Sequence, residues 1–312
     1  MAATASRSAA GSPLRRSRPR YGEAVIKGLL LTASLVSVAT TIGIVASLVP
    51  PTIRFFEKVG FGEFLTGTDW SPLFEPASYG VLPLVTATLT ITVIAIAVAV
   101  PVGLAAAIYL SEYATPRTRS ILKPVLEVLA GIPTVVYGFF ALSFLTPLLQ
   151  DLWPVGEPPE IFNGLSAGLV MGMMIVPTVA SLSEDAMASV PQSLRQGAYA
   201  LGSTKRITAL NVVLPAALSG IVAAVVLAIS RAVGETMIVA VAAGLRPNFT
   251  LNPLEAMQTM TGFIAAAGEG DLPVSSFDYT TIFAVGMLLF LATFAMNFLS
   301  IRLVRKYREV YE

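Results

Sequence analysis

The sequence of 312 residues contains no cysteine and no histidine. The missing thiols exclude disulfides and thiolate chemistry, and the missing imidazoles exclude histidine-based catalysis and the commonest zinc sites. Charged residues make up only 12% of the chain, whereas hydrophobic residues make up 55%. A soluble domain of this length cannot bury so much apolar surface, so the composition predicts a membrane protein that crosses the bilayer several times.

The chain also lacks the Gly-x-x-x-x-Gly-Lys-Ser/Thr sequence by which P-loop proteins hold the phosphates of ATP. We therefore expect no nucleotide or other cofactor in this chain. If ATP drives the function of this chain, a partner protein must bind and hydrolyse the ATP.

Six apolar runs approach or exceed the roughly 20 residues that span the hydrocarbon core of a bilayer. The second and fifth runs are longer than this, so we expect them to tilt, kink or protrude. The sequence thus predicts an all-α protein with six transmembrane helices. The runs cover residues 25–49, 79–110, 125–149, 165–182, 213–245 and 279–304.

Lysine and arginine are concentrated on one predicted side of the membrane. Sixteen of the twenty lie in the N-terminal tail, the second and fourth connections, and the C-terminal end. The positive-inside rule then places both termini in the cytoplasm. We expect residues 1–22, which have few apolar side chains, to form a disordered basic tail, and residues 23–312 to form the transmembrane domain.

Arg231 and Glu235 are the only ionisable residues in the apolar run 212–245. A charge in the bilayer interior is costly, so such residues usually face the protein interior or a watery path and have a partner. If the run is one helix, a spacing of four puts both side chains on one face, and Gly234 lets a backbone or ligand approach closely. The alternatives are an ion pathway and a structural pair that neutralises itself.

The fourth connection, residues 183–212, is more elaborate than a loop that merely joins two spans. It predicts two short helices, 184–190 and 193–201, separated by Pro191. Gly202 suits the position after a helix end, and Ser203 with Thr204 can cap a further amphipathic stretch.

This connection resembles the EAA loop of ABC importer permeases. The pattern of that loop is Glu-Ala-Ala, three residues, Gly, nine residues, Ile, one residue, Leu-Pro. Gly202, Leu214 and Pro215 match in spacing. The departures are Gln196 for Glu, Gly197 for Ala, and Val212 for Ile.

Three motifs in the same order resemble the PstC-type permease family of phosphate-specific ABC transporters. The resemblance covers the chain from about residue 79 to its end, and an additional N-terminal span and a large first outer loop also match. The motifs are Ala-Gly-Ile-Pro-Thr-Val-Val-Tyr-Gly at 130–138, Gly-Ala-Tyr-Ala-Leu-Gly at 197–202, and Arg-Ala-Val-Gly-Glu-Thr-Met at 231–237.

The resemblance implies a type I ABC importer permease fold in a bacterial or archaeal membrane. Spans two to six would cross over with a sister permease (PstA-like), an ATPase dimer (PstB-like) would bind ATP and Mg²⁺, and an extracytoplasmic phosphate-binding protein (PstS-like) would deliver phosphate. The chain itself would not be an enzyme. The EAA-like loop would couple it to the ATPase through Gln196, Gly197, Ala198, Tyr199, Ala200, Leu201, Gly202, Leu214 and Pro215.

We assign a substrate path to residues of the other two motifs. The planar guanidinium of Arg231 suits phosphate oxygens, and Glu235 would be its counter-ion and an acceptor for a phosphate hydroxyl, which sulfate lacks. Pro133 removes a helix hydrogen bond between two hydroxyl-bearing residues, although prolines in spans are more often packing kinks. The predicted path comprises Arg231, Glu235, Thr236, Thr134 and Tyr137.

Three other functions fit parts of this pattern. The chain could be a permease for molybdate, tungstate or sulfate, a secondary carrier that uses Glu235 for proton coupling, or a membrane scaffold. The structured EAA-like loop argues against the last two, because neither needs a surface on which an ATPase docks.

Overall fold

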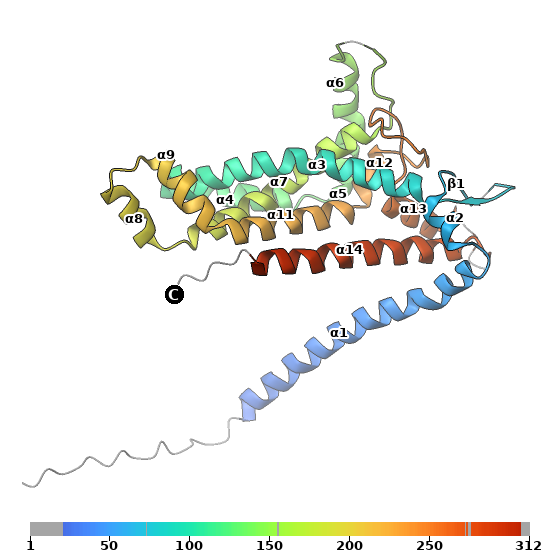
Figure 1. The fold of residues 1–312 in the computed structure, drawn as a ribbon, viewed down its shortest axis with the longest axis horizontal. Helices are drawn as coiled ribbons and strands as arrows, with labels where there is room; N and C mark the ends of the chain where they lie inside the picture. The colour runs from blue at the N-terminus through green and yellow to red at the C-terminus, as the bar shows by residue number, and fades with distance from the viewer. Residues whose placement is uncertain (1–20, 73, 155, 272, 274–275, 307–312) are drawn as a thin grey trace, which may run out of the picture. The chain divides into compact units, whose positions relative to one another are not determined.

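The computed structural model describes residues 21–306 except residues 73, 155, 272, 274 and 275. The described chain is almost entirely helical, and its only strands are the two-residue β1 (Trp70–Ser71) and β2 (Ser78–Tyr79), which pair in antiparallel register (Figure 1). The predicted all-α fold is confirmed. The predicted basic tail lies, up to residue 20, outside the described residues.

The chain divides into two units, residues 1–47 and 48–312. The described part of the first unit is the N-terminal portion of α1 (Tyr21–Phe56). Its large apolar side chains, among them Leu29 and Val36, are exposed. An apolar helix with exposed side chains suits a lipid environment, in which the helix satisfies all of its own backbone hydrogen bonds.

Four helical segments in the described chain are long and apolar enough to cross a membrane, and two bent pairs of helices raise the number to as many as six. The four segments are residues 25–56, 82–113, 164–188 and 280–302. The first bent pair joins residues 116–130 to 134–151, and the second joins 205–216 to 218–233.

The second unit contains the remaining elements, several of which are separated only by π-helical turns (η). In chain order they are α2 (Phe61–Thr66), α3 (Leu82–Ile108), η1 (Tyr109–Tyr113), α4 (Pro116–Ala130), α5 (Thr134–Phe140), η2 (Ala141–Leu145), α6 (Thr146–Asp151), α7 (Gly164–Ala188), α8 (Gln192–Ala200), α9 (Lys205–Thr208), η3 (Ala209–Val213), α10 (Leu214–Ala216), α11 (Leu218–Val233), α12 (Met237–Ala242), α13 (Met260–Ala266), η4 (Ala267–Asp271) and α14 (Thr280–Lys306).

The centre of the second unit is α7, which packs against α3 and α11 (Figure 1). Small residues allow α3 and α7 to approach closely, because a β-carbon on Gly172 would lie 2.8 Å from the Ala95 carbonyl oxygen. A β-carbon on Gly103 would lie 2.7 Å from the Val179 β-carbon. Close approach through small residues is the usual way in which membrane helices gain packing contacts. The buried core around this contact includes Ile91, Ala99, Ala167, Met171, Ile175 and Ala228.

The third predicted span, residues 125–149, is divided between two helical segments. α4 ends at Ala130, and the segment from α5 to α6 runs at 85° to it. Pro133 has no backbone N–H and disfavours the helical conformation at Ile132, so the break falls where the sequence cannot continue a helix. By contrast, Pro101 and Pro177 lie inside the continuous helices α3 and α7.

The fifth predicted span, residues 213–245, is also not a single helix. A bend of 71° at Ala217 separates α10 from α11. α11 then ends at Val233, and the short α12 begins at Met237 after a three-residue break. Gly234 is the residue after α11, and its φ of −88° is one that other residues also adopt.

The connection after α7 differs from its prediction in one respect. The predicted short helix 184–190 does not exist as a separate element, because α7 continues to Ala188 before the chain turns at Pro191. The second predicted helix, 193–201, corresponds to α8. Thr204 caps α9 as expected, since its side chain accepts a hydrogen bond from the Ile207 amide.

Aromatic side chains hold the elements at the opposite end of the second unit from α8. Phe55 lies edge-on to Phe64 with ring centroids 5.4 Å apart, and Trp70 lies edge-on to Phe263 at 4.9 Å. These contacts join the end of α1, α2, β1 and α13. The sequence has no disulfide to order this region, so packing orders it instead.

Candidate functional site

Two helix breaks that are far apart in the sequence lie next to each other. α5, which follows the break at residues 131–133, packs against α12, which follows the break at residues 234–236. Gly138 permits this contact, because a β-carbon there would lie 3.3 Å from the Met237 carbonyl oxygen and 3.4 Å from the Ile238 α-carbon. The structure therefore brings together the two motifs to which the sequence assigned the substrate path.

Glu235 lies in the second break and not on a helix. Its Oε1 atom accepts hydrogen bonds from the backbone amides of Met237 at 3.1 Å and Ile238 at 3.3 Å, which are the first residues of α12. A carboxylate suits this position, because the first amides of a helix have no partners within the helix and carry partial positive charge. Glu235 thus caps α12.

The prediction that Arg231 and Glu235 share one helix face is wrong. Arg231 lies in the last turn of α11, which ends at Val233, whereas Glu235 follows the helix end at Gly234. Among the described residues no ion pair joins the two side chains. Because α11 ends at Val233, the four-residue spacing does not place the two side chains on one helix face.

Arg231 is exposed in this chain, whereas the hydroxyl of Tyr137 in α5 is engaged within the chain. That hydroxyl donates a hydrogen bond of 2.9 Å to the Leu129 carbonyl, so Tyr137 in α5 reaches back across the first break to α4. Thr134 is the first residue of α5, and Thr236 donates a weak hydrogen bond of 3.4 Å to the Gly234 carbonyl. The five predicted path residues therefore all lie at or beside the two breaks.

A third segment supports the second break from its far side. The hydroxyl of Thr261, in α13, donates a hydrogen bond of 2.6 Å to the backbone carbonyl of Glu235. The backbone amide of the preceding residue, Met260, donates to the buried hydroxyl of Thr88 in α3 at 3.1 Å. Sequence reasoning missed both contacts, because only the fold brings α13 beside α12 and α3.

The EAA-like loop forms a second candidate site at the other end of the unit. α8 ends in a glycine-dependent turn: Gly202 has φ +80°, its amide donates to the Tyr199 carbonyl at 2.9 Å, and the Ser203 amide donates to the Ala198 carbonyl at 3.1 Å. This is the hydrogen-bond pattern of a Schellman motif. The prediction that Gly202 ends the helix is confirmed.

The predicted docking residues are mostly exposed on α8 and just after it. Leu201, directly after α8, is 89% exposed. Leu214 packs against the buried cluster around Met187 and Val213, whereas Pro215 is exposed. The other exposed residues of the set are Gln196, Gly197, Tyr199, Ala200 and Gly202, and Ala198 is half-buried.

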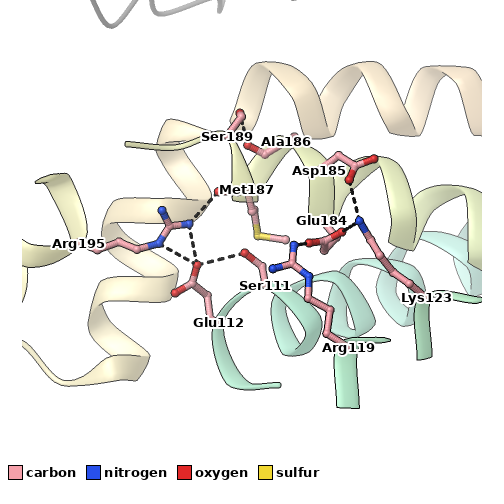
Figure 2. Close-up of polar contacts among 10 residues, drawn as sticks. All are labelled: Ser111, Glu112, Arg119, Lys123, Glu184, Asp185, Ala186, Met187, Ser189 and Arg195. Carbon is pink, nitrogen blue, oxygen red and sulfur yellow. Dashed lines mark hydrogen bonds and ion pairs between the residues drawn. The ribbon is translucent and has the colours of Figure 1, made fainter. Parts of the chain in front are cut away.

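A buried ion pair anchors α8 to the ends of two long helices (Figure 2). Arg195 binds Glu112 Oε1 through Nε at 3.2 Å and through Nη2 at 3.0 Å. Its Nη2 also donates to the Met187 carbonyl at 2.8 Å, and its Nη1 donates to the Val190 carbonyl at 2.6 Å. Both charged residues are buried. Sequence reasoning missed this pair, because nothing but the position of Glu112 directly after an apolar run points to it.

A second ionic cluster holds α4 against the same end of α7 (Figure 2). Glu184 is fully buried and forms ion pairs with Arg119 and, at 2.6 Å, with Lys123. Lys123 also pairs with Asp185 at 3.0 Å. Two of the basic residues that set the predicted orientation therefore neutralise a buried carboxylate as well.

Comparison with known proteins gives consistent results over most of the chain. The family model for "Binding-protein-dependent transport system inner membrane component" matches residues 99–309. A probable ABC transporter permease protein, YqgH of Bacillus subtilis, is 35% identical over 89% of this chain and 88% of its own length. The phosphate transport system permease protein PstC of Xylella fastidiosa strain Temecula1 is 33% identical over 78% of this chain and 80% of its own length.

A solved structure has the same fold. It is a chain of a bacterial alginate ABC transporter in complex with an alginate pentasaccharide-bound periplasmic protein, with a TM-score of 0.63 and 14% identity. The match covers 92% of this chain and 98% of that chain. The chain therefore belongs to the family of binding-protein-dependent transport system inner membrane components, which are the multi-pass permease subunits of ABC importers.

Proposed function

We propose that this chain is the transmembrane permease subunit of an ATP-driven importer of inorganic phosphate and that it forms half of the translocation path. The similarity to phosphate transport permeases supports the choice of substrate. The site supports it chemically, because the paired breaks present one guanidinium together with hydroxyl groups and a carboxylate.

The position of Arg231 carries the proposal. It is exposed in the last turn of α11, just before a break that adjoins a second break. A guanidinium offers several N–H donors in a planar fork that matches two phosphate oxygens. Broken helices that line a path are a recurring way for transporters to place polar groups in the membrane.

We assign two roles to the carboxylate of Glu235. Through Oε1 it caps α12 and so fixes the geometry of the break beside Arg231. We assign its Oε2 atom to the hydroxyl of a protonated phosphate. Such a hydroxyl donates a hydrogen bond, which fully ionised sulfate cannot do, so this contact would favour phosphate over sulfate.

The partners follow from the family. Permeases of this kind are not catalytic, and a separate ATPase hydrolyses ATP. We infer a PstA-like sister permease, a PstB-like ATPase dimer that binds ATP and Mg²⁺, and an extracytoplasmic PstS-like phosphate-binding protein. The exposed surface of α8, Leu201 and Gly202 is the face that we assign to the ATPase. We further propose, from the distribution of lysine and arginine, that α8 and both termini lie in the cytoplasm.

Uptake by the assembled transporter tests the substrate. The chain with its three partners, reconstituted in proteoliposomes, should accumulate radiolabelled phosphate only when ATP is inside and the loaded binding protein is outside. Vanadate should stop uptake. An excess of unlabelled sulfate or molybdate should not compete. If molybdate, tungstate or sulfate accumulates and phosphate does not, the substrate is another oxyanion and the assignment to phosphate is wrong.

A further inference from the structure

Arg195 joins three elements through one side chain. It belongs to α8, its carboxylate partner Glu112 lies in η1 at the end of α3, and the two carbonyls that it binds, of Met187 and Val190, lie at and just beyond the end of α7. Carbonyls in the last turn of a helix have no partner within the helix, so the guanidinium satisfies them while it neutralises Glu112. Four hydrogen bonds thus fix the direction in which Arg195 points.

α8 has few other attachments to the spans. Arg195 is the only side chain that is buried in this helix, all of whose residues the structure describes. Leu194 is half-buried and packs against the apolar cluster that contains Met187 and Val213. The remaining side chains of α8 are exposed apart from Ala198. Apart from the chain connections at its two ends, α8 is therefore held to the bundle chiefly through Arg195 and Leu194.

The elements that Arg195 binds are the ends of the two most tightly packed helices. α3 and α7 interlock along their lengths through Gly103 and Gly172, so a displacement at their ends moves them together. The chemistry of the contact also matters. A buried ion pair rarely stabilises a protein more than apolar side chains of the same size would, whereas the four hydrogen bonds of Arg195 are directional. Such a contact suits the transmission of movement better than it suits stability.

We propose that Arg195, with Glu112, is the positioning residue that transmits movement of α8 to α3 and α7, so that ATP hydrolysis is coupled to reorientation of the spans. This inference rests on the proposed function, since it assumes that α8 meets an ATPase. It predicts that loss of the contact separates hydrolysis from transport, whereas a purely structural pair affects only folding and assembly.

The test uses the complete transporter in proteoliposomes and measures two rates, phosphate uptake and ATP hydrolysis stimulated by the loaded binding protein. The double variant Arg195→Met with Glu112→Leu removes both charges at once and leaves neither one stranded in the core. We expect this variant to assemble and hydrolyse ATP, with uptake per ATP lowered about tenfold, since several hydrogen bonds to a charged group are lost. Uptake per ATP equal to that of the unaltered transporter would overturn the inference.

The conservative variant Arg195→Lys provides a second, independent measurement of uptake per ATP. Lysine keeps the charge that Glu112 needs, so the protein should fold, but its single ammonium cannot reach the carboxylate and both carbonyls in the same fork. We expect uptake per ATP to fall about threefold, which reflects the loss of part of the hydrogen-bond set. If the double variant does not assemble, this variant decides the matter, and an unchanged ratio overturns the inference.

Lys123→Met is the matched control. It removes one of the two cations that neutralise buried Glu184 on the α4 side of the same helix end, and it leaves α8 untouched. Its yield should fall, but its uptake per ATP should not. An equal loss of the ratio in this control would mean that any damage at this end uncouples the transporter, and the specific role of Arg195 would be refuted. Failure of the unaltered transporter to import phosphate would instead reject the proposed function.

Discussion

The hydroxyl of Thr261 donates a hydrogen bond of 2.6 Å to the backbone carbonyl of Glu235, which ties the start of α13 to the break between α11 and α12. Through this contact the aromatic packing of Trp70 against Phe263, in the same helix α13, is connected to the residues assigned to the substrate path.

Removal of the Thr261 hydroxyl tests whether its hydrogen bond stabilises the break between α11 and α12. Thr261→Val keeps the shape of the side chain but leaves the Glu235 carbonyl without its partner, at a cost of about 1–3 kcal/mol for an unsatisfied buried acceptor. We expect reduced thermal stability of the purified complex and slower phosphate uptake. Thr261→Ser, which retains the hydroxyl, is the control and should keep most of both. Equal behaviour of the two variants would show that the hydrogen bond does not support the site.

Two substitutions of Arg231 test the contributions of its charge and of its planar guanidinium separately. Arg231→Lys keeps the charge and loses the fork, and Arg231→Gln loses both, so phosphate uptake per assembled complex should fall about tenfold or more in each. Assembly should be normal, because Arg231 is exposed in this chain and forms no ion pair with Glu235. Radiolabelled uptake, divided by the amount of purified complex, provides the measurement. Uptake by Arg231→Lys at the unaltered level would exclude bidentate recognition.

Glu235 makes separable contributions to structure and to transport. Glu235→Gln retains an oxygen that can accept from the Met237 and Ile238 amides, so α12 should stay capped while the charge is lost. Glu235→Leu removes the cap, with an expected loss of about 0.5–2 kcal/mol of stability. We predict that Gln impairs uptake with assembly intact, and that Leu impairs both.

The double variant Arg231→Met with Glu235→Leu separates a role in transport from a role in structure alone. If neither side chain contacts the substrate, apolar replacement of both should cost stability through the lost cap of α12 but leave uptake per assembled complex near normal. If they contact the substrate, the variant should assemble in part and should not import phosphate. Uptake per assembled complex is decisive, and a near-normal value would remove both residues from the mechanism.

The exposed turn after α8 should be sensitive to added charge. Gly202 has a positive φ that other residues adopt only with strain, and a buried charge in a docking groove must lose its hydration. Gly202→Asp and Ala198→Arg should therefore leave the chain in the membrane, abolish uptake and weaken co-purification of the ATPase. Normal uptake and co-purification in both variants would refute the docking role.

Orientation can be tested apart from transport. A reporter fused after Glu312 should lie in the cytoplasm, and one inserted near Asp151 should lie outside, because most of the lysines and arginines fall on the side of the termini. An external reporter at the C-terminus would contradict the arrangement of six spans and the sites placed on it.

Local features of the fold could be predicted where their cause lies within a few residues. The glycine turn at Gly202 and the cap at Thr204 depend on neighbouring residues, and the structure confirms both. The break at Pro133 was visible as a missing helix hydrogen bond, but its bend of 85° was not, since that angle depends on what α4 and α5 pack against.

The candidate sites could be predicted only in part, because their decisive contacts join distant segments. Arg231 and Glu235 stood out as charges in an apolar run, but a continuous run conceals the end of α11 at Val233, so the sequence suggested a shared helix face. The pairing of Arg195 with Glu112 joins residues that are 83 positions apart. Neither residue has a local pattern that indicates the other.

The contact between Gly172 and Ala95 has a consequence for how such a transporter can change shape. A β-carbon at residue 172 would lie 2.8 Å from the Ala95 carbonyl, so this interface has no slack for sliding by even part of a helical turn. We therefore expect α3 and α7 to move together as one rigid pair of helices. The helices are instead interrupted at residues 131–133, 217 and 234–236, and the predicted path residues lie at or beside the first and the last of these interruptions. If the chain bends at these interruptions during transport, the surroundings of Arg231 change while the packing of α3 against α7 is preserved.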